Sequence, residues 1–277
     1  MKQQTWTIYI TVALLTTQLF LGYLAIPLMS GSHALIAGYP DIIIVGEDEG
    51  LVINEDGKLQ AQEEPSNKPQ VVVESEKSVA RREALKRDLD KGLFILVNKQ
   101  NSVDRSYKPD DLTAIKYFAS DRSKEGRVMR AEAAEAFNQL SEVAAKEGYE
   151  IIVTTAYRSY EFQSTLYNNY VKRHGQQKAD TFSAQPGKSE HQTGLAADVS
   201  SPSVGYQLVE DYINTPEGRW LNDNAYKFGF IIRFPKGKES ITGYMYEPWH
   251  IRYVGKTAAE EIYSKGLTLE EYVEKEI

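Results

Sequence analysis

Hydrophobic and polar positions divide the chain into three stretches of different character. Residues 6–29 are almost wholly apolar, and no charged residue occurs between Lys2 and Asp41. Residues 41–75 are rich in acids, glutamine and proline, and their apolar runs are short and isolated. From residue 76 onward, apolar residues recur at the spacings of helices and strands. The pattern predicts an N-terminal segment at 1–40, a linker at 41–75 and a folded domain at 76–277.

Helical spacing marks several segments of the folded domain. Ala133, Phe137, Leu140 and Ala144 repeat with the period of an amphipathic helix over residues 128–146, and Gly148 ends the pattern. Other segments share charged or aromatic residues at helical spacing, or a Thr-Pro start, and we expect helices at 75–92, 159–175 and 215–230, with one or two more in 256–277.

Strand-like runs alternate with these helices. They lie at 93–99, 149–159, 194–200, 230–234 and 249–255. Helices mixed with short, widely separated strands favour an α+β domain. We therefore expect a small, largely antiparallel central sheet flanked by helices.

The apolar N-terminal stretch predicts a membrane-targeting segment. It exceeds the roughly 7–15 residues of a usual signal-peptide core and approaches the roughly 20 that span a bilayer. We expect an uncleaved signal-anchor; small residues at 32–38 leave a cleaved signal peptide as an alternative, and a buried soluble helix as a third. The first two put the domain outside the cytoplasm, either anchored at the cell surface or secreted to the cell wall. Residues 41–75 would then form a stalk with brief strand pairing.

Charge and cysteine content exclude several kinds of chemistry. A net charge of -7 argues against nucleic acid as the main partner, because phosphate binding needs a basic surface. The chain has no cysteine, which excludes disulfides, thiolate metal ligands and a cysteine nucleophile. The oligomeric state is left open by the sequence.

Two histidines stand beside carboxylates in a pattern that suits a metal. His191 precedes Asp198 by seven residues, with a turn at Gly194, and His250 follows Glu247 by three. Two imidazoles and one carboxylate suit a zinc ion with its fourth position open to water, and a nearby carboxylate could act as base. By residue type alone, however, a lone histidine such as His191 is more often a structural or surface residue than a metal ligand. Arg158, at the end of a strand, is a candidate to bind a carboxylate or an oxyanion.

Longer motifs around these residues resemble a known family. "SEHQTGLAAD" (189–198) and "EPWH" (247–250) resemble the Ser-x-His-x-x-Gly-x-Ala-x-Asp and Glu-x-x-His patterns of the D-alanyl-D-alanine carboxypeptidase family. This is the group of VanY-like zinc peptidases, which includes the L,D-carboxypeptidases of bacterial cell walls. "LVNKQN", "AYRSYEFQ" and "YKFGFIIRFP" are also similar to the family, so the resemblance spans about residues 90–256.

The resemblance implies a role for each motif residue. His191, Asp198 and His250 would bind Zn²⁺, and Glu247 would be the catalytic base. The remaining residues would contact the substrate's terminal carboxylate or the oxyanion, or would line the site: Arg158, Gln163, Ser189 and Trp249. The implied fold is a small α+β domain of the Hedgehog/DD-peptidase-like type, with zinc on a central antiparallel sheet.

The expected activity is that of a zinc carboxypeptidase. A zinc-activated water would remove the C-terminal D-alanine from a peptidoglycan stem peptide, with D,D or L,D specificity left open. Two alternatives remain on the same fold: an endopeptidase or D-Ala-D-Ala dipeptidase, and a non-catalytic wall-binding module that keeps zinc for structure. Glu247 beside a three-ligand site argues against the last, because structural zinc sites are usually closed by a fourth protein ligand.

Overall fold

The computed structural model describes residues 42–43, 72–73, 75–120 and 123–277. The chain divides into two compact units, Met1–Val79 and Ala80–Ile277. In the first, β1 (Ile42–Ile43) and β2 (Val72–Val73) pair antiparallel, which confirms the brief strand pairing predicted within the linker. The predicted membrane-targeting segment at 1–40 lies outside the described residues. No helix in the described part of the chain is long and apolar enough to cross a membrane.

The second unit carries the predicted α+β fold. Its strands are β3 (Leu112–Ala114), β4 (Val128–Arg130), β5 (Ile152–Thr155), β6 (Ala196–Ser200), β7 (Phe230–Phe234) and β8 (Glu247–Tyr253). The helices are α1 (Glu76–Asp90, whose first turns belong to the first unit), α2 (Ala131–Lys146), α3 (Tyr160–His174), α4 (Gln176–Phe182), α5 (Pro216–Asn224), α6 (Glu239–Thr242), α7 (Lys256–Lys265) and α8 (Leu269–Glu276).

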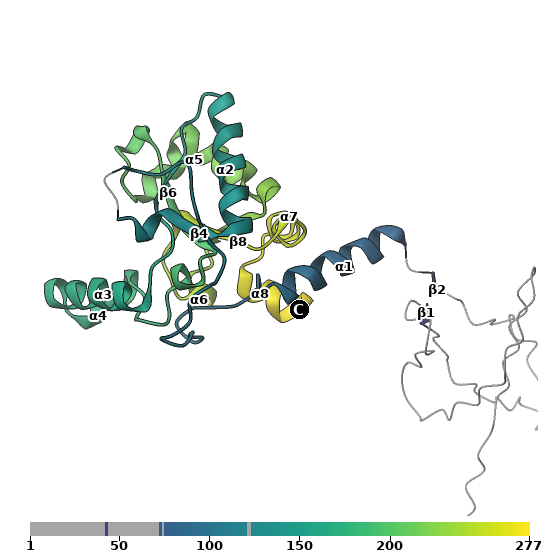
Figure 1. Ribbon diagram of the computed structural model, residues 1–277, viewed down its shortest axis with the longest axis horizontal. Coiled ribbons are helices and arrows are strands. Elements are labelled where there is room, and N and C mark those ends of the chain that lie inside the picture. The colour runs from purple at the N-terminus through teal and green to yellow at the C-terminus, as the bar shows by residue number, and fades with distance from the viewer. Residues whose placement is uncertain (1–41, 44–71, 74, 121–122) are drawn as a thin grey trace, which may run out of the picture. The chain divides into compact units, whose positions relative to one another are not determined.

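One four-stranded antiparallel sheet forms the centre of this unit. Its strands lie in the order β5-β6-β8-β7, so β6 and β8, far apart in sequence, are neighbours in the middle. A separate antiparallel pair joins β3 and β4. Figure 1 shows α2 and α5 close to the strands, with α3 and α4 side by side at another end of the domain. The small central antiparallel sheet predicted from the sequence is therefore confirmed.

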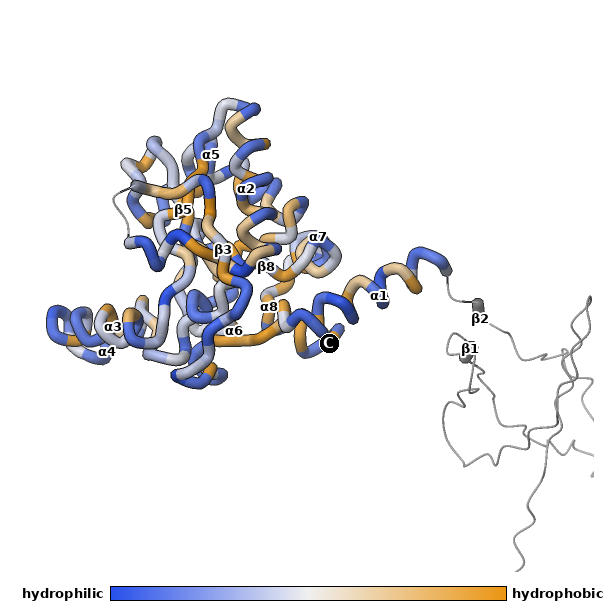
Figure 2. The backbone as a smooth tube through the Cα atoms, viewed as in Figure 1, coloured by the Kyte–Doolittle hydropathy of each residue, from blue (hydrophilic) through white to orange (hydrophobic). Residues whose placement is uncertain are grey.

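An apolar core covers one face of the sheet. Phe137 and Leu140 of α2 are fully buried and belong to one cluster with Val153, Ala197 and Ile251 from three strands. Figure 2 shows apolar and polar residues alternating along α2, and Ala133, Phe137, Leu140 and Ala144 are among its buried residues. Burial of a large apolar side chain contributes about 1.5–3 kcal/mol, so this face supplies much of the stability of the fold.

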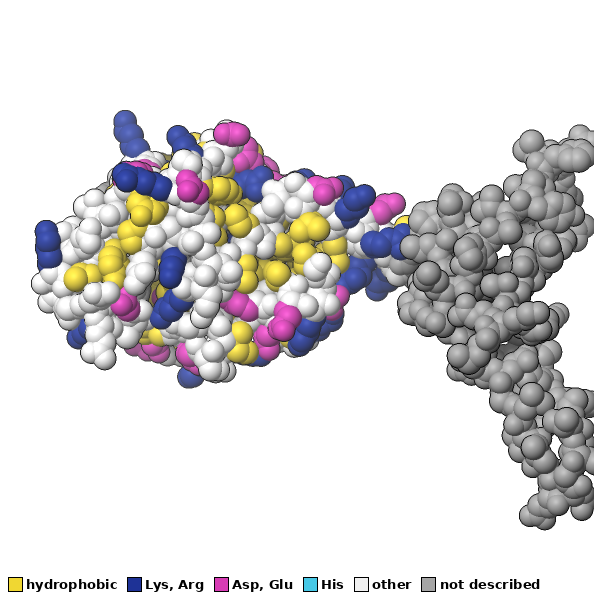
Figure 3. All heavy atoms as spheres, turned by 90° about the horizontal axis from the view of Figure 1, so that it is seen from below, with side chains coloured by type: hydrophobic (Ala, Val, Ile, Leu, Met, Phe, Trp, Pro, Cys, Tyr) yellow, Lys and Arg dark blue, Asp and Glu magenta, His cyan; other side chains and the backbone are white. Residues whose placement is uncertain are grey.

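The C-terminal helices form a second, smaller core. Ile262 of α7 and Leu269 and Tyr272 of α8 pack with Phe94 and with Ile231 of β7. Thr268 caps α8 through a capping box with Glu271. On the face of the molecule that Figure 3 shows, Lys and Arg side chains lie among Asp and Glu side chains, so the two signs of charge are mixed there.

One predicted strand is wrong. Residues 93–99 are buried at Leu93, Phe94 and Val97 but form no strand. The carbonyl groups of Leu93 and Ile95 accept hydrogen bonds from the guanidinium group of Arg252 instead of from a neighbouring strand. The backbone carbonyls of this buried apolar run therefore bond to a side chain. The periodicity of the run does not reveal such a partner.

The other elements agree with their predictions, with shifted ends. The helix predicted over 128–146 begins at Ala131, because Val128–Arg130 pair with β3. The helix that starts at Thr215 has that residue as its N-cap, with the hydroxyl accepting from the N–H of Gly218. The C-terminal segment forms two helices. The pair β3–β4 and the short helices α4 and α6 were not anticipated.

Candidate metal and catalytic site

A short 3₁₀ helix and two strands bring the candidate metal ligands together. His191 lies in the 3₁₀ helix η2 (Glu190–Thr193), which ends at Gly194 with φ 69°. A Cβ at Gly194 would lie 2.9 Å from Leu112 and 3.2 Å from Arg130, so the close approach also requires glycine. The chain then enters β6, where Ala197 faces the core and Asp198 faces the other side. Neighbouring residues of β6 therefore face opposite sides of the sheet.

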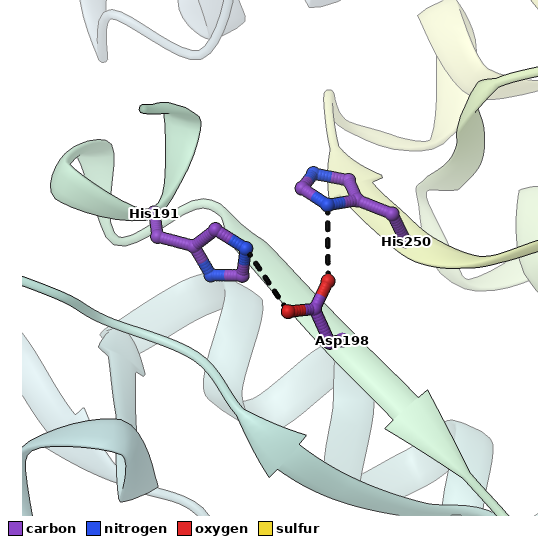
Figure 4. Close-up of side chains that lie close together, drawn as sticks. All are labelled: His191, Asp198 and His250. Carbon is purple, nitrogen blue, oxygen red and sulfur yellow. Dashed lines mark ion pairs between the residues drawn. The ribbon is translucent and has the colours of Figure 1, made fainter. Parts of the chain in front are cut away.

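Asp198 is paired directly with His250 across the sheet. The register of β6 and β8 sets these two residues opposite each other. His191 Nε2 lies 3.3 Å from one carboxylate oxygen of Asp198, and His250 Nδ1 lies 3.0 Å from the other. Figure 4 shows the two imidazole rings on either side of the carboxylate. One possible ligand atom from each of the three residues lies within 4.8 Å of the others, and all three residues are buried.

An irregularity in β8 brings Glu247 to the same place. Ile232 pairs with Ile251 and Phe234 with Glu247, so two steps along β7 face four steps along β8. Such a bulge redirects side chains. The carboxylate of Glu247 consequently lies 3.6 Å from His250 Nδ1, although the two residues are three apart on a strand.

Hydrogen bonds orient His191. Its Nδ1 lies 2.6 Å from the carbonyl oxygen of Ala156, so Nδ1–H donates there and Nε2 presents a lone pair to the cluster. Burial, together with the nearby Arg158, lowers the pKa of His191 to about 4. A neutral imidazole is the form that binds a metal.

The other two residues of the cluster carry opposite shifts. Burial alone would raise the pKa of Asp198, but its pairing with His191 and His250 holds it well below the usual value. Burial alone would lower the pKa of His250, but its contact with the carboxylate of Asp198 and the nearby carboxylate of Glu190 raise it to about 9. Asp198 is therefore anionic and binds whatever positive charge the two imidazoles or a metal ion supply.

Burial gives Glu247 the pKa expected of a base. Its pKa is raised to about 7, chiefly by burial and against the opposing effect of His250. A carboxylate with a pKa near neutral pH can take up and release a proton under physiological conditions.

Comparisons with known proteins identify relatives of this chain. The VanY family model, described as D-alanyl-D-alanine carboxypeptidase, matches residues 126–256. YodJ of Bacillus subtilis strain 168, a protein assigned as a carboxypeptidase, is 50% identical over 184 residues, which are 66% of this chain and 67% of that one. The chain belongs to the D-alanyl-D-alanine carboxypeptidase family.

Solved structures of the same family share the fold. The LdcB LD-carboxypeptidase is 51% identical with a TM-score of 0.62, over 65% of this chain and 85% of that one. A variant of the vancomycin-resistance D,D-pentapeptidase VanY, solved in complex with Zn(II), is 34% identical with a TM-score of 0.54, over 65% of this chain and 98% of that one. The α+β domain described above is thus the fold of this carboxypeptidase family.

Three of the four residues predicted to contact substrate or line the site do line a cavity, and the fourth does not. Arg158 donates to Gln163 Oε1 at 2.8 Å and to Asp198 at 3.2 Å, and it lines a cavity beside the cluster together with Ser189 and Trp249. Trp249, expected to line the site, is half-buried on the cavity wall. Gln163 is buried and does not line the cavity; its amide donates to the carbonyl of Ala184. A direct contact of Gln163 with substrate therefore stays a prediction, whereas its support of Arg158 is observed.

A cavity of about 740 Å³ opens over these residues. Its polar lining includes Arg158, His191, Asp198, Glu247 and His250, and part of its apolar wall comes from α3 and the end of α4, with Phe162, Leu166, Tyr170 and Phe182. The volume lies within the usual range for small-molecule and peptide sites.

A group of buried charges beside His191, Asp198 and His250 was not predicted from the sequence. Arg233 of β7 and Arg252 of β8 are fully buried and both donate to Glu190 Oε1, and Glu270 of α8 pairs with Arg233. A signal was present, because Arg233 stands among apolar and aromatic residues in β7, and Arg252 stands between Ile251 and Tyr253 in β8. A buried charge requires a partner of opposite sign, so these positions could have been recognised as part of an ion network.

Proposed function

We propose that the protein is a zinc-dependent carboxypeptidase that removes the C-terminal D-alanine from peptidoglycan stem peptides. The observation that carries the proposal is the buried cluster of His191, Asp198 and His250, with Glu247 beside it, in the polar lining of the cavity. The family to which the chain belongs, and the names of its structural relatives, supply the reaction and the substrate.

The donor set fits zinc. Two imidazoles and one carboxylate are a usual set for catalytic zinc, which keeps a position free for water or substrate. The two rings are buried, lie 4.9 Å apart and are nearly perpendicular, and both face the carboxylate of Asp198. His191, Asp198 and His250 would hold the zinc ion, which would lower the pKa of a water molecule and polarise a carbonyl group.

Two further residues of the chain have proposed roles in the reaction. Glu247 would accept a proton from the attacking water and pass it to the leaving amine, and its pKa near 7 supports both steps. Arg158 presents a guanidinium group to the cavity and would pair with the carboxylate of the substrate or with the developing oxyanion. Its bond to Gln163 holds the guanidinium in place.

The similarity to LdcB favours an L,D-carboxypeptidase over a D,D-carboxypeptidase. The chain is 51% identical to that L,D enzyme and 34% identical to the D,D-pentapeptidase, over the same 65% of its length. We therefore propose the stem tetrapeptide, which ends in one D-alanine after an L-centre, as the preferred substrate.

Product analysis tests this function. The purified protein is incubated with tetrapeptide and pentapeptide stems, with and without a chelator, and the products are weighed by mass spectrometry. We expect release of single D-alanine, faster from the tetrapeptide, lost with the chelator and restored by zinc. Release of a dipeptide or of cross-link fragments would show that the protein is a dipeptidase or an endopeptidase. No release from either stem would contradict the proposal.

We further propose that the enzyme works outside the cytoplasm, held at the cell surface by the apolar segment 1–40 on a stalk of residues 41–75. The support is the uncharged, largely apolar composition of residues 6–29 and the polar composition that follows. Cell fractionation combined with N-terminal sequencing distinguishes this anchor from a cleaved signal peptide. If the protein is found in the medium and its sequence begins after residue 38, the segment is a cleaved signal peptide and the protein is secreted.

A further inference from the structure

Glu190 connects the candidate metal site to a buried ion network. It precedes His191 in η2, and only 3% of its surface is exposed. Its Oε1 accepts from Arg233 Nε at 2.6 Å and from Arg252 Nη1 at 2.8 Å. Its other oxygen, Oε2, points to His250 Nε2 at 3.5 Å.

The charges of this network balance without His250. Arg233 uses its two remaining nitrogens on Glu270 of α8, at 2.8 and 2.6 Å. Arg252 directs Nη2 to the carbonyls of Leu93 and Ile95. Asn98 also donates to Glu270 Oε1, at 3.1 Å, so every carboxylate oxygen of the two glutamates has a hydrogen-bond donor except Glu190 Oε2. The two carboxylates and two guanidinium groups carry no net charge when His250 is neutral, which is the form that a metal requires.

His250 Nε2 and Glu190 Oε2 are an unsatisfied pair. Within the described residues, both belong to the few buried side-chain atoms that make no hydrogen bond. A metal ion on His250 Nδ1 fixes the proton of the neutral ring on Nε2, and that N–H then requires an acceptor. Glu190 Oε2 is the carboxylate oxygen that faces it.

We propose that Glu190 is a positioning residue of the metal centre, whose Oε2 accepts the Nε2–H of His250 and so presents Nδ1 to the metal. This inference rests on the proposed function, because it presupposes a metal on His250. Arg233 and Arg252 fix the direction of Oε2 by holding Oε1. Glu270 lies beyond the residues matched by the family model and is linked to Glu190 through Arg233.

The substitution Glu190→Gln tests the hydrogen bond with little change in size. The amide oxygen would turn to the arginines, which need an acceptor, so the amide N–H₂ would face His250 Nε2. That donor favours the wrong tautomer, with the proton on Nδ1. We expect the zinc dissociation constant, measured by competition with a chromophoric chelator, to rise about 10–100-fold, the usual effect of losing such a supporting contact. The visible spectrum of the cobalt-substituted protein would change as well.

Two further variants separate positioning from folding. Glu270→Gln removes the same charge from the same Arg233 without touching His250, so it controls for damage to the network and should weaken zinc binding much less. Glu190→Asp keeps the charge between the arginines but shortens the reach to His250, so it should weaken zinc binding even if Glu190→Gln fails to fold. Circular dichroism checks the fold of each variant.

The outcomes decide between the inference and its alternatives. Weaker zinc binding in the Glu190 variants, beyond that of Glu270→Gln, supports positioning. Unchanged zinc affinity and cobalt spectrum in a folded Glu190 variant would overturn it, and a raised KM with unchanged zinc affinity would instead make Glu190, which lines the cavity, a substrate contact. Failure of the wild-type protein itself to bind zinc would overturn the proposed function and the inference together.

Discussion

The two faces of the central sheet are built on opposite principles. On one face, Ala197 and Ile251 join the apolar core beneath α2, and no charge intervenes among that cluster's residues. On the other face, the next residues along the same strands are Asp198, His250 and Arg252, all buried. A single alternation of residues along β6 and β8 therefore separates the part that stabilises the fold from the part that carries the proposed chemistry.

Burial stabilises the protein on the α2 face and is costly on the face that carries the charged residues. Apolar burial on the α2 face is favourable in itself. Burial of carboxylates and imidazoles is unfavourable unless each is paired, and Glu247 shows the remaining cost as a pKa raised to about 7. The free energy gained by burial on the apolar face thus offsets the cost of burying charged groups on the polar face. Substitutions on the two faces should have separable effects, on stability for one and on metal binding and turnover for the other.

The largest expected effect is on the polar face. Asp198→Asn removes the charge that both imidazoles face but keeps the size of the side chain. Zinc contributes several kcal/mol to such a transition state, so we expect D-alanine release to fall by more than about 10³-fold, with loss of bound zinc. Metal analysis and product release measure the two effects. Full zinc occupancy in this variant would remove Asp198 from the ligand set.

A cavity on the apolar face should do the reverse. Leu140 of α2 is fully buried. Leu140→Ala should lower the free energy of unfolding by about 2–5 kcal/mol in urea titration, through lost burial and the cavity left behind. The folded variant should keep the zinc affinity of the wild type. A large loss of zinc affinity at unchanged stability would show that the two faces are not separable.

The pH dependence of stability in metal-free protein tests the cost of burying Glu247. Its pKa is raised from 4.5 to about 7, so the folded state holds this proton more tightly than the unfolded state. The associated stability is fully present below pH 4.5 and is lost as the pH rises through about 7. Between pH 4 and 8 the wild type should therefore lose about 3 kcal/mol relative to Glu247→Gln, at 1.36 kcal/mol per pKa unit. Parallel pH profiles for the two chelator-treated proteins would contradict the raised pKa.

The smallest expected effect is at the cap of α8. Thr268 accepts from the N–H of Glu271 at 3.2 Å and is buried. Thr268→Ala should cost about 1 kcal/mol, seen as a decrease of roughly 2–4 °C in Tm. Zinc affinity should be little changed, because α8 is linked to Glu190 indirectly, through Glu270 and Arg233. A strong loss of zinc binding would give the C-terminal helix a more direct part in the site.

Local patterns predicted most of the helices and the strands of the sheet. The period of residues 133–144, the Thr215 cap and the alternation of "GLAAD" are properties of neighbouring residues, and the structure has the corresponding elements. The clustering of His191, Asp198 and His250 was reached through the family motifs, since the sequence does not show that β6 pairs with β8.

The misses depend on contacts between distant residues. Residues 93–99 resemble a strand, but Arg252, more than 150 positions later, binds their carbonyls. The role of Glu190 is similarly hidden, because its partners Arg233 and Arg252 come from two later strands. A buried ion network has no period along the chain, so local reasoning cannot assemble it.

The decisive experiment on the proposed reaction uses the Glu247→Gln variant in its zinc-loaded form. We expect this variant to bind one zinc per chain with the affinity of the wild type or better. Its release of D-alanine from the stem tetrapeptide should fall by about 10²–10⁴-fold, the usual contribution of a general base. Turnover at the wild-type rate with zinc bound would contradict the assignment of Glu247, and with it the proposed reaction at this face of the sheet.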